Sequence, residues 1–554
     1  MSQRGSFSRH PLRTLGVPCL LLLLSACSPL PSAVGGPTPT PPPMASATST
    51  PQVTSVWIAP GLPAALRQTI QLPPGFSSAA DPASASLRLT VGGRRSLSAW
   101  VYALVTPFPT IPDGVSWDDL RSDWQGGSSG PFAGQPVLLS QETLSVLSAV
   151  WKAPAPSATL VLPADQILAY AWAHRPAWAI VPFESIEPRW KVLEVDGLSP
   201  IHKQFSAADY ALTVSVGIDG PEPQAASLVK ALQSSVPASN RDPAKLTTLV
   251  MTGVTALVRA TAWTMEQKGI VYPARDIGDW LRDADITHIS NEVSFAAGCP
   301  YPNRDQINLF FCSDPRYIQL LEDVGTDVVE LTGNHLNDWG TSADRYTLQL
   351  YRQRGWAYYG GGENLEEARK PVILTDHGNR IAFIGCNPVG PDFDWATADG
   401  PGSAPCDLDY MSAQIRELRN QGILPIATFQ YYEYYTFPPR PNQVRDFQAM
   451  AEAGAVIVSG SQSHVPQAMD FHDGAFIHYG LGNLFFDQML YRNQSGQIVP
   501  GTRWEFIDRH VFYAGRYLGT EILTAMLEDY ARPRPMTTAE RAALLSQAFA
   551  ASGW

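Results

Sequence analysis

The chain has 554 residues, of which 45% are hydrophobic and 16% are charged, and its formal net charge is −12. This composition is typical of globular protein, and the length exceeds what one ordinary core supports, so we expect two domains of roughly 150–300 residues each. An acidic surface repels phosphate backbones and anionic headgroups. The charge therefore argues against a nucleic-acid partner and against direct binding to an anionic lipid surface.

The first residues have the pattern of a targeting segment. Arg4, Arg9 and Arg13 precede a short apolar run, and small residues follow it, which predicts a signal peptide over residues 1–26. The four residues that end in Cys27, Leu-Ser-Ala-Cys, resemble the lipobox of bacterial lipoproteins. The resemblance implies an exported protein held at the extracytoplasmic face of the cell membrane by a lipid on Cys27. The alternative is a plain secretory signal peptide with an incidental cysteine.

A tether and a first α/β domain are expected next. Residues 27–52 carry no charge and are rich in Pro, Thr and Ser, which predicts an extended linker. The following domain, residues 53–238, has strand patterns at 86–91, 98–108 and 177–183 and helix patterns at 115–126 and 163–172. In the first of these helices Ser116 is the expected N-cap. The order of these segments resembles the periplasmic solute-binding fold, whose role would be to bind a small polar ligand.

Strand and helix patterns alternate through a second domain, residues 239–535. Strand patterns begin at 246, 286 and 326, and helix patterns cover 276–285, 314–325 and 342–355. Two hairpins are predicted, with turns at His377-Gly378 and Asp473-Gly474. Alternation combined with hairpins favours a layered α/β sandwich with mixed sheets. We expect a C-terminal helix over residues 536–554 after it.

The predicted export guides the interpretation of the remaining cysteines. Cys299 and Cys312 lie 13 residues apart, and Cys386 and Cys406 lie 20 apart. An even number of cysteines in an oxidising compartment favours two local disulfides, although four cysteines allow three connectivities.

Several strand ends in the second domain carry side chains suited to metal binding or catalysis. In a layered α/β protein such residues gather where strands end. Glu292, Asn334, His335 and His464 have nitrogen and oxygen ligands of the kinds that a divalent metal prefers. Other interpretations remain: His464 as a hydrogen-bonded structural histidine, and Asn334 and Asp338 as residues that orient the loop after the strand.

A series of seven phrases adds a family resemblance. In chain order over residues 246–490 they are "TGVT", "SNEVSF", "GNHLNDWG", "GGGENLEEARKP", "FQYYEYY", "GSQSHVPQ" and "LGNLFFD". The series resembles the motifs of the CapA family, which is linked to capsule and poly-γ-glutamate synthesis. The resemblance implies the fold of calcineurin-like metallophosphoesterases in this half of the chain.

The departures from the family pattern reduce the expected metal site. Val254 stands where the family has an aspartate, and the family's "HWG" histidine falls on Phe429, next to Gln430. A further histidine position holds Ser461 or Gln462. The missing groups are those that bind the metals of a metallophosphoesterase. We therefore expect either one weak site for Mn, Zn or Mg or no metal at all.

The candidate residues follow from both lines of argument. The expected metal ligands are Glu292, Asn334, His335 and His464; the expected catalytic residues are these four with Asp338 and Glu433; the expected ligand-binding residues are Asn291, Arg259, Gln430, Gln462 and Asn483. Glu433 has a second interpretation as a solvated strand residue. Arg259 is the best placed isolated cation for an anionic substrate.

Three functions are compatible with these residues. The first is an exported, lipid-anchored CapA-like protein, a hydrolase or transferase, that makes, processes or anchors a capsular or poly-γ-glutamate-type surface polymer. The second is an inactive binding protein for a polar ligand. The third is a metal-dependent phosphoesterase, which Val254 and Phe429 disfavour.

Overall fold

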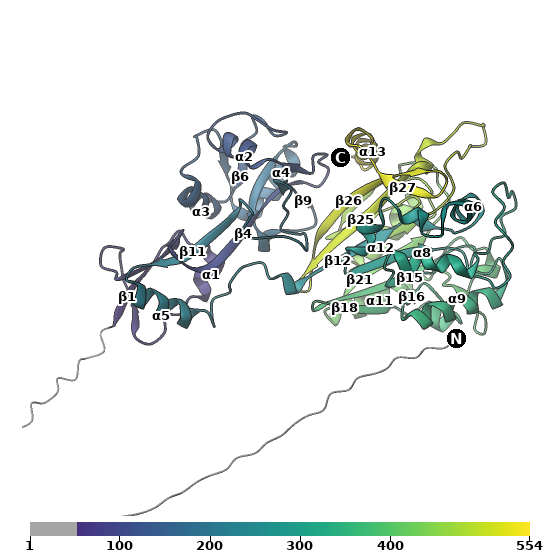
Figure 1. The fold of residues 1–554 in the computed structure, drawn as a ribbon, viewed down its shortest axis with the longest axis horizontal. Coiled ribbons are helices and arrows are strands. Elements are labelled where there is room, and N and C mark those ends of the chain that lie inside the picture. Colours follow the sequence, from purple (N-terminus) through teal and green to yellow (C-terminus); the bar gives the residue numbers. More distant parts are fainter. Residues whose placement is uncertain (1–52) are drawn as a thin grey trace, which may run out of the picture. The chain divides into compact units, whose positions relative to one another are not determined.

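Two sets of β-sheets organise the part of the chain that the computed structural model describes, residues 53–554 (Figure 1). Contacts join Val53–Trp554 into one unit. The predicted signal peptide, the lipid attachment at Cys27 and the tether lie outside the described residues. Within the described residues, no helix is both long enough and apolar enough to cross a bilayer.

The N-terminal region is built on a nine-stranded sheet in the order β2-β1-β3-β11-β4-β8-β6-β7, with β9 paired to β4. Its strands are β1 (Thr54–Ile58), β2 (Phe76–Ser78), β3 (Leu87–Val91), β4 (Arg95–Pro107), β6 (Val137–Leu139), β7 (Thr159–Val161), β8 (Trp178–Pro182), β9 (Trp190–Val192) and β11 (Thr213–Asp219). The short strands β5 (Gly114–Val115) and β10 (Glu194–Val195) pair separately. The helices are α1 (Ala64–Thr69), α2 (Trp117–Trp124), α3 (Gln141–Trp151), α4 (Ile167–Ala173) and α5 (Glu222–Leu232).

Local sequence accounts for the start of α2. The side chain of Ser116 accepts a hydrogen bond from the backbone N–H of Asp119, as expected of an N-cap. Asp118 and Asp119 place negative charge in the first turn, where the helix dipole favours it.

The C-terminal region contains two larger sheets. The first has the order β16-β15-β14-β12-β25-β26-β27, with β13 paired to β14, and the second has the order β18-β19-β21-β22-β24-β23. The strands of the first are β12 (Leu246–Thr252), β13 (Val254–Thr255), β14 (Ile286–Asn291), β15 (Val328–Glu330), β16 (Ala357–Tyr359), β25 (Trp504–Tyr513), β26 (Arg516–Glu528) and β27 (Arg532–Pro535). Those of the second are β18 (Val372–Asp376), β19 (Asn379–Cys386), β21 (Leu424–Gln430), β22 (Ile457–Ser461), β23 (Met469–His472) and β24 (Ala475–His478). A two-stranded ladder joins β17 (Gly361–Gly362) to β20 (Gly402–Ser403).

The two sheets face each other across a shared apolar core. Leu249 and Val328 of the first sheet belong to the same buried cluster as Phe383 and Ile426 of the second. Helices cover the outer faces. They are α6 (Arg259–Lys268), α7 (Gly278–Arg282), α8 (Ile318–Asp323) and α9 (Thr341–Arg354) on the first sheet, and α11 (Leu408–Asn420) and α12 (Pro441–Glu452) on the second, with the short α10 (Leu365–Ala368) beside β17. The expected fold class, α/β with a layered sandwich of mixed sheets, is confirmed.

The parallel strands of each sheet end at a common edge, the carboxyl edge of the sandwich. Strands β12, β14, β15 and β16 run parallel in the first sheet, and β19, β21, β22 and β24 run parallel in the second. Strands β12 and β21 are buried along their whole length, as expected of strands covered on both faces. The loops that leave their carboxyl ends are the natural place for a site.

Both predicted hairpins are present. Strands β18 and β19 pair antiparallel around His377-Gly378, and β23 and β24 pair antiparallel around Asp473-Gly474. The first residue of each turn has a positive φ, 46° for His377 and 49° for Asp473, which matches the backbone twist that tight hairpins need.

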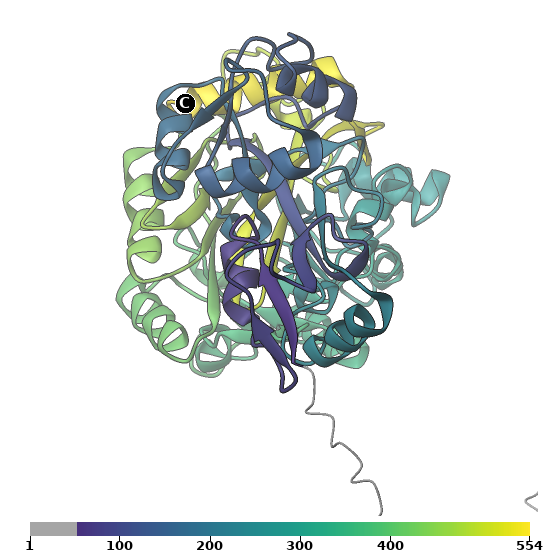
Figure 2. The same cartoon turned by 90° about the vertical axis from the view of Figure 1, so that its left-hand side faces the viewer.

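The C-terminal helix α13 (Thr538–Ala551) connects the sandwich to the N-terminal region. The guanidinium of Arg541 donates two hydrogen bonds to the Asp113 carboxylate, at 2.7 and 2.9 Å. In Figure 2, α13, drawn in yellow, lies beside blue segments of the N-terminal region. Phe108 also packs against Phe549 and Trp554, so apolar and ionic contacts both fix this helix.

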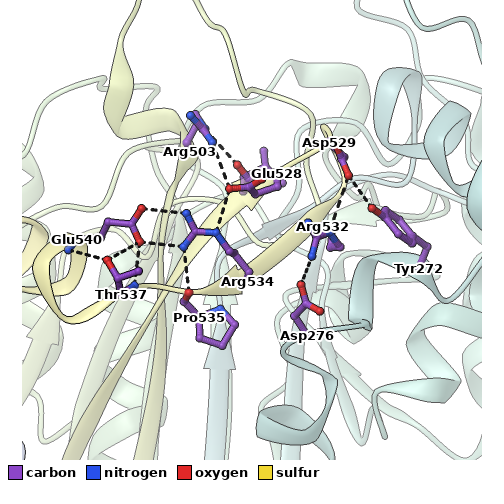
Figure 3. A network of polar contacts seen from close by, with 11 residues as sticks. Tyr272, Asp276, Arg503, Glu528, Asp529, Arg532, Arg534, Pro535, Thr537 and Glu540 are labelled. Atoms are coloured by element: carbon purple, nitrogen blue, oxygen red, sulfur yellow. Dashed lines mark hydrogen bonds and ion pairs between the residues drawn. The ribbon is translucent and has the colours of Figure 1, made fainter.

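A network of ion pairs holds β27 and the start of α13 (Figure 3). Arg534 donates to Glu528 at 2.9 Å and, through two nitrogens, to Glu540 at 2.8 and 2.9 Å. Thr537 caps α13 by accepting the N–H of Glu540. The network therefore sets the direction in which the chain leaves the sheet.

Two local disulfides are present, in the pairing that the sequence favours. Cys299 is joined to Cys312, and Cys386, the last residue of β19, is joined to Cys406 before α11. The second bridge ties down the segment that carries Asn387 and Asp394, both fully buried.

Replacing Cys386 and Cys406 together by Ala should lower the free energy of unfolding by about 3 kcal/mol, because the unfolded chain regains the entropy of an open loop of this length. The measurement is urea unfolding followed by circular dichroism. Reduction of the parent protein is the matched comparison. Equal stability of the parent and the double variant under oxidising conditions would contradict the expectation.

Candidate functional site

Side chains from both sheets of the sandwich meet at the carboxyl edge. Glu292 follows β14, Asn334 follows β15, Gln430 ends β21, and Gln462 follows β22. Three of them, Glu292, Gln430 and Gln462, are at most 4% exposed. The sandwich therefore brings together residues that are up to 170 positions apart in the chain.

The amide nitrogen of Gln430 lies at the centre of this group. It is 3.0 Å from Oε2 of Glu292 and 3.1 Å from Oδ1 of Asn334, and it also donates to Oε1 of Gln462. The carbonyl oxygen of the same amide accepts a hydrogen bond from the hydroxyl of Ser461. A side chain of the second sheet thus contacts polar groups of both sheets.

The loop after β22 has an unusual backbone. Gln462 and His464 have φ values of 75° and 52°, in the left-handed region. This conformation costs on the order of 1 kcal/mol for a residue with a side chain. Such a cost is typical of loops whose side chains must point in a particular direction. Here the side chain of Gln462 contacts Gln430, and that of His464 contacts Asn483.

His335 and Asp338 form the first histidine–carboxylate pair of the site. Nδ1 of His335 lies 2.7 Å from Oδ2 of Asp338, which also accepts the backbone N–H of Phe311 at 2.8 Å. Burial opposes protonation of the imidazole, but the hydrogen bond to Asp338 and the charge of Glu292 outweigh it and raise the pKa of His335. Nδ1 is held by Asp338, so Nε2 is the ring nitrogen left for a substrate.

His464 and Glu433 form the second pair. Nδ1 of His464 lies 2.8 Å from Oδ1 of Asn483, and Nε2 lies 3.4 Å from Oε1 of Glu433. Burial opposes protonation here as well, but Glu433 outweighs it and raises the pKa of His464, while the contact with His464 lowers the pKa of Glu433. The two ring nitrogens of His464 thus each lie next to an oxygen acceptor.

Asp394 is a residue of the site region that the sequence analysis missed. Its side chain is fully buried, and Oδ1 accepts the backbone N–H of Asn337 at 2.6 Å. Burial raises the pKa of Asp394 to about 7, with a further contribution from the charge of Asp338. No motif marks it, because its partner lies 57 residues away in the chain.

Two predicted ligand-binding residues are engaged elsewhere. The amide of Asn291 donates to the carbonyl of Val293 and the hydroxyl of Tyr351, both at 2.9 Å, on the side of β14 that faces α9. Arg259 forms an ion pair with Asp487, so its charge is already neutralised. Asn291 is thus turned toward α9, whereas Arg259, although paired, is among the residues that line a cavity near the Cys299–Cys312 disulfide.

The side chains of Phe429 and Gln430 point in opposite directions, and the one that reaches the site is not the one aligned with the family's histidine. Phe429 stacks on Phe447 of α12, with ring centroids 4.6 Å apart, within the apolar core behind the second sheet. Because neighbouring residues of a strand point to opposite faces, Gln430 is the one that reaches the site. The position that the sequence analysis aligned with the family's histidine, Phe429, therefore points into the core, and its neighbour Gln430 points to the site.

The four predicted metal ligands do not form a fitting donor set. The point where the oxygens of Glu292 and Asn334 converge is taken by an N–H donor of Gln430, which cannot ligate a cation. Both ring nitrogens of His464 are engaged with Asn483 and Glu433. The residues present therefore do not fit the divalent ion expected from the sequence.

One group of metal-ligating side chains is found in the described part of the chain, away from these residues. Asp285, Asp376 and His377 place one ligand atom each within 4.8 Å of one another. Nζ of Lys203 lies 2.7 Å from Asp285, and the hydroxyl of Thr247 donates to Asp376 at 2.7 Å. Lysine and hydroxyl donors already satisfy these carboxylates, so we assign no ion to the group.

A cavity of about 310 Å³ lies between α6 and the segment from Cys299 to Cys312. It lies under the segment closed by the Cys299–Cys312 disulfide, and Phe311 and Trp339 are among its lining residues. The ring of Phe311 also lies 4.8 Å from that of His335, but His335 and Asp338 are not among the residues that line the cavity.

Comparison with known proteins identifies relatives of the C-terminal half. The family model described as "Bacterial capsule synthesis protein PGA_cap" matches residues 248–488. The "Capsule biosynthesis protein CapA" of Bacillus anthracis is 26% identical over 323 residues, which cover 57% of this chain and 75% of that protein. The "PGA biosynthesis protein CapA" of Bacillus subtilis (strain 168) is 27% identical over 183 residues, which cover 33% of this chain and 48% of the relative.

A solved structure gives a more distant likeness. The 5'-nucleotidase precursor of Thermus thermophilus is 14% identical, with a TM-score of 0.29, and the match covers 55% of this chain and 59% of that chain. Similarity at this level does not bear on activity.

Gln430→Glu should create a divalent-cation site. The variant replaces the central N–H donor by a carboxylate, so that two carboxylates and two amide oxygens would surround one point, a set that suits hard cations. We expect millimolar Mn²⁺ to raise the Tm of this variant by several degrees and that of the parent much less. Gln319→Glu, on the exposed side of α8, adds the same charge elsewhere and is the control. An equal Mn²⁺ response of the parent would show that the ion already fits.

Asp394→Asn should change the pH dependence of stability. A carboxyl whose pKa rises from 3.8 to about 7 on folding binds a proton in the folded state that the unfolded state releases. The protonated carboxyl contributes fully to the free energy of unfolding below pH 4. This contribution falls as the pH rises to 7 and does not change further above that pH. The free energy of unfolding of the variant, relative to that of the parent, should therefore increase by on the order of a few kcal/mol between pH 4 and pH 8. Urea unfolding across this range tests it, with the exposed Asp392→Asn as the control; a pH-independent difference contradicts the shift.

Proposed function

Residues 248–488 belong to the CapA family of bacterial capsule synthesis proteins, and on this premise we propose that the protein acts in the synthesis, processing or anchoring of a capsular or poly-γ-glutamate-type surface polymer. The names of the two Bacillus relatives, which refer to capsule and PGA biosynthesis, support this assignment. The alignments cover about half to three quarters of those relatives, so the polymer itself belongs to the proposal.

We place the protein outside the cytoplasm, attached to the membrane by a lipid on Cys27. The basic and apolar pattern of residues 1–26 and the Leu-Ser-Ala-Cys ending support this proposal. Two disulfides in the sandwich fit an oxidising compartment. The uncharged residues 27–52 would then separate the folded unit from the lipid.

The chemistry that the site supports best is proton transfer at an amide bond of the polymer. The observation that carries it is the presence of two histidine–carboxylate pairs, His335–Asp338 and His464–Glu433, whose imidazoles both act on the buried Glu292. Asp338 holds Nδ1 of His335, which leaves Nε2 to take a proton from a water that attacks the amide carbonyl and to return it to the leaving amine as the C–N bond breaks. His464, whose pKa the Glu433 carboxylate raises, would when protonated place positive charge near a carbonyl oxygen on which negative charge develops. No step in this scheme passes through a metal.

A binding protein without catalysis is the second candidate. It is favoured by one observation, the amide of Gln430, which fills the centre of the site with neutral hydrogen bonds and not with a reactive group. The third function raised from the sequence, a metal-dependent phosphoesterase, receives no support from this donor set.

His335→Gln should abolish polymer processing. Gln keeps a polar side chain but cannot take up a proton, and general-base catalysis contributes about 10²- to 10⁴-fold. The assay follows the chain length of poly-γ-glutamate incubated with the purified protein. His472→Gln, a half-buried histidine paired with Glu452 on the edge strand β23, is the matched control and should keep full activity.

The pH profile provides an independent check of the same assignment. Because the pKa of His335 lies above 6.5, the rising limb of kcat/KM should lie above pH 6.5 and should vanish in His335→Gln. Binding of the polymer without any change of its length, in the parent and in both variants, would favour the binding protein instead.

A further inference from the structure

The centre of the candidate site has more hydrogen-bond acceptors than its donor can satisfy. Three side-chain oxygens, from Glu292, Asn334 and Gln462, lie within hydrogen-bond distance of the single amide nitrogen of Gln430. A primary amide has two N–H groups. When Glu292 is ionised, one of the three acceptors is therefore without a hydrogen from this amide; Glu292 and Gln462 are at most 4% exposed, and Asn334 is half-buried.

The charges around this point favour a cation. Three carboxylates, those of Glu292, Asp338 and Glu433, face two imidazoles, those of His335 and His464. Even with both imidazoles protonated, the formal charge of the ionised group is −1. Arg259 does not offset it, because Asp487 neutralises this side chain.

Glu292 is the charged member of the three acceptors. Its side chain is 2% exposed, and Oε2 lies 3.0 Å from the neutral amide nitrogen of Gln430. A cation seated against this carboxylate would supply the positive charge that a neutral amide does not.

We propose that the oxygens of Glu292, Asn334 and Gln462 form a binding site for a primary ammonium group, in which the amide of Gln430 stands in until the ligand arrives. An ammonium has three N–H groups for the three acceptors and brings the positive charge that the carboxylate lacks. This proposal rests on the proposed function, since it names the part of the substrate that the same site takes.

Spacing distinguishes an ammonium from a metal ion. The oxygens of Glu292 and Asn334 lie 3.0 and 3.1 Å from the nitrogen at the centre, which are ordinary N–H···O distances. A Mg²⁺ ion at the same point would need its oxygens at about 2.1 Å. The site would have to contract by nearly 1 Å to hold the metal, whereas a nitrogen donor fits the existing spacing.

The proposal also gives the polymer a direction. A γ-linked glutamate chain carries many carboxylates and a single primary amino group at its amino terminus. A net negative site repels the carboxylates and attracts the amino group. The amino end of the chain would therefore be the end that enters.

The test measures thermal stabilisation of the full-length protein by two cations of equal charge. The probes are n-butylammonium chloride, which has three N–H groups, and tetramethylammonium chloride, which has none. Gln430→Ala removes the competing amide, and Gln430→Ser is the second variant should the first fail to fold. Gln319→Ala, on the exposed side of α8, is the matched control.

We expect n-butylammonium to bind Gln430→Ala at least about tenfold more tightly than it binds the parent, and tetramethylammonium to stabilise neither. Adding Glu292→Gln to Gln430→Ala should lower the affinity about tenfold or more, because a charge-assisted hydrogen bond is lost. Equal stabilisation by both cations, no binding to either folded Gln430 variant, or stronger stabilisation of the parent by Mn²⁺ than by n-butylammonium would each overturn the proposal.

A second pair of probes separates this proposal from the proposed function. γ-L-Glutamyl-L-glutamate should compete with n-butylammonium, and its N-acetylated form should not. Competition without any processing of poly-γ-glutamate would refute the catalytic function and leave the ammonium site standing. Processing that is unaffected by Glu292→Gln would refute the ammonium site and leave the function standing.

Discussion

The amide of Gln430 is the contact on which the arrangement of the site depends. It extends from the second sheet of the sandwich to Glu292 and Asn334, which follow strands of the first. A buried carboxylate needs hydrogen-bond donors, and at this edge the opposite sheet supplies them. Loss of this contact would leave polar groups of both sheets unpaired, so the packing of the sheets and the geometry of the site are coupled.

The two histidines owe their charge state to groups around them. Asp338 is itself held by the backbone N–H of Phe311, and Asn483 is held by the carbonyl of Thr502 at 3.2 Å. Each imidazole is therefore oriented by a residue that is fixed in turn. The left-handed backbone at Gln462 and His464 shows that the fold accepts local strain to direct these side chains.

The N-terminal region supports the sandwich at residues other than these. Phe108 packs against Phe471, Phe476 and the end of α13, and Arg541 of α13 pairs with Asp113. None of the contacts involves a side chain of the site. The region thus stabilises the sandwich core while the carboxyl edge of its parallel strands is formed by the C-terminal region alone.

Local pattern in the sequence predicted much of the fold and supplied the candidate residues of the site. Hydrophobic periodicity and turn residues predicted the hairpins at His377 and Asp473, and cysteine spacing favoured the two bridges. Strand-end position pointed to Glu292, His335 and His464. Only the tertiary structure decided that Gln430 fills the centre, that Asn291 turns toward Tyr351, and that Asp394 lies under the loop. The reason is physical: these outcomes depend on which face of a strand a side chain takes and on partners from 57 to 138 residues away, and no local pattern records such distances.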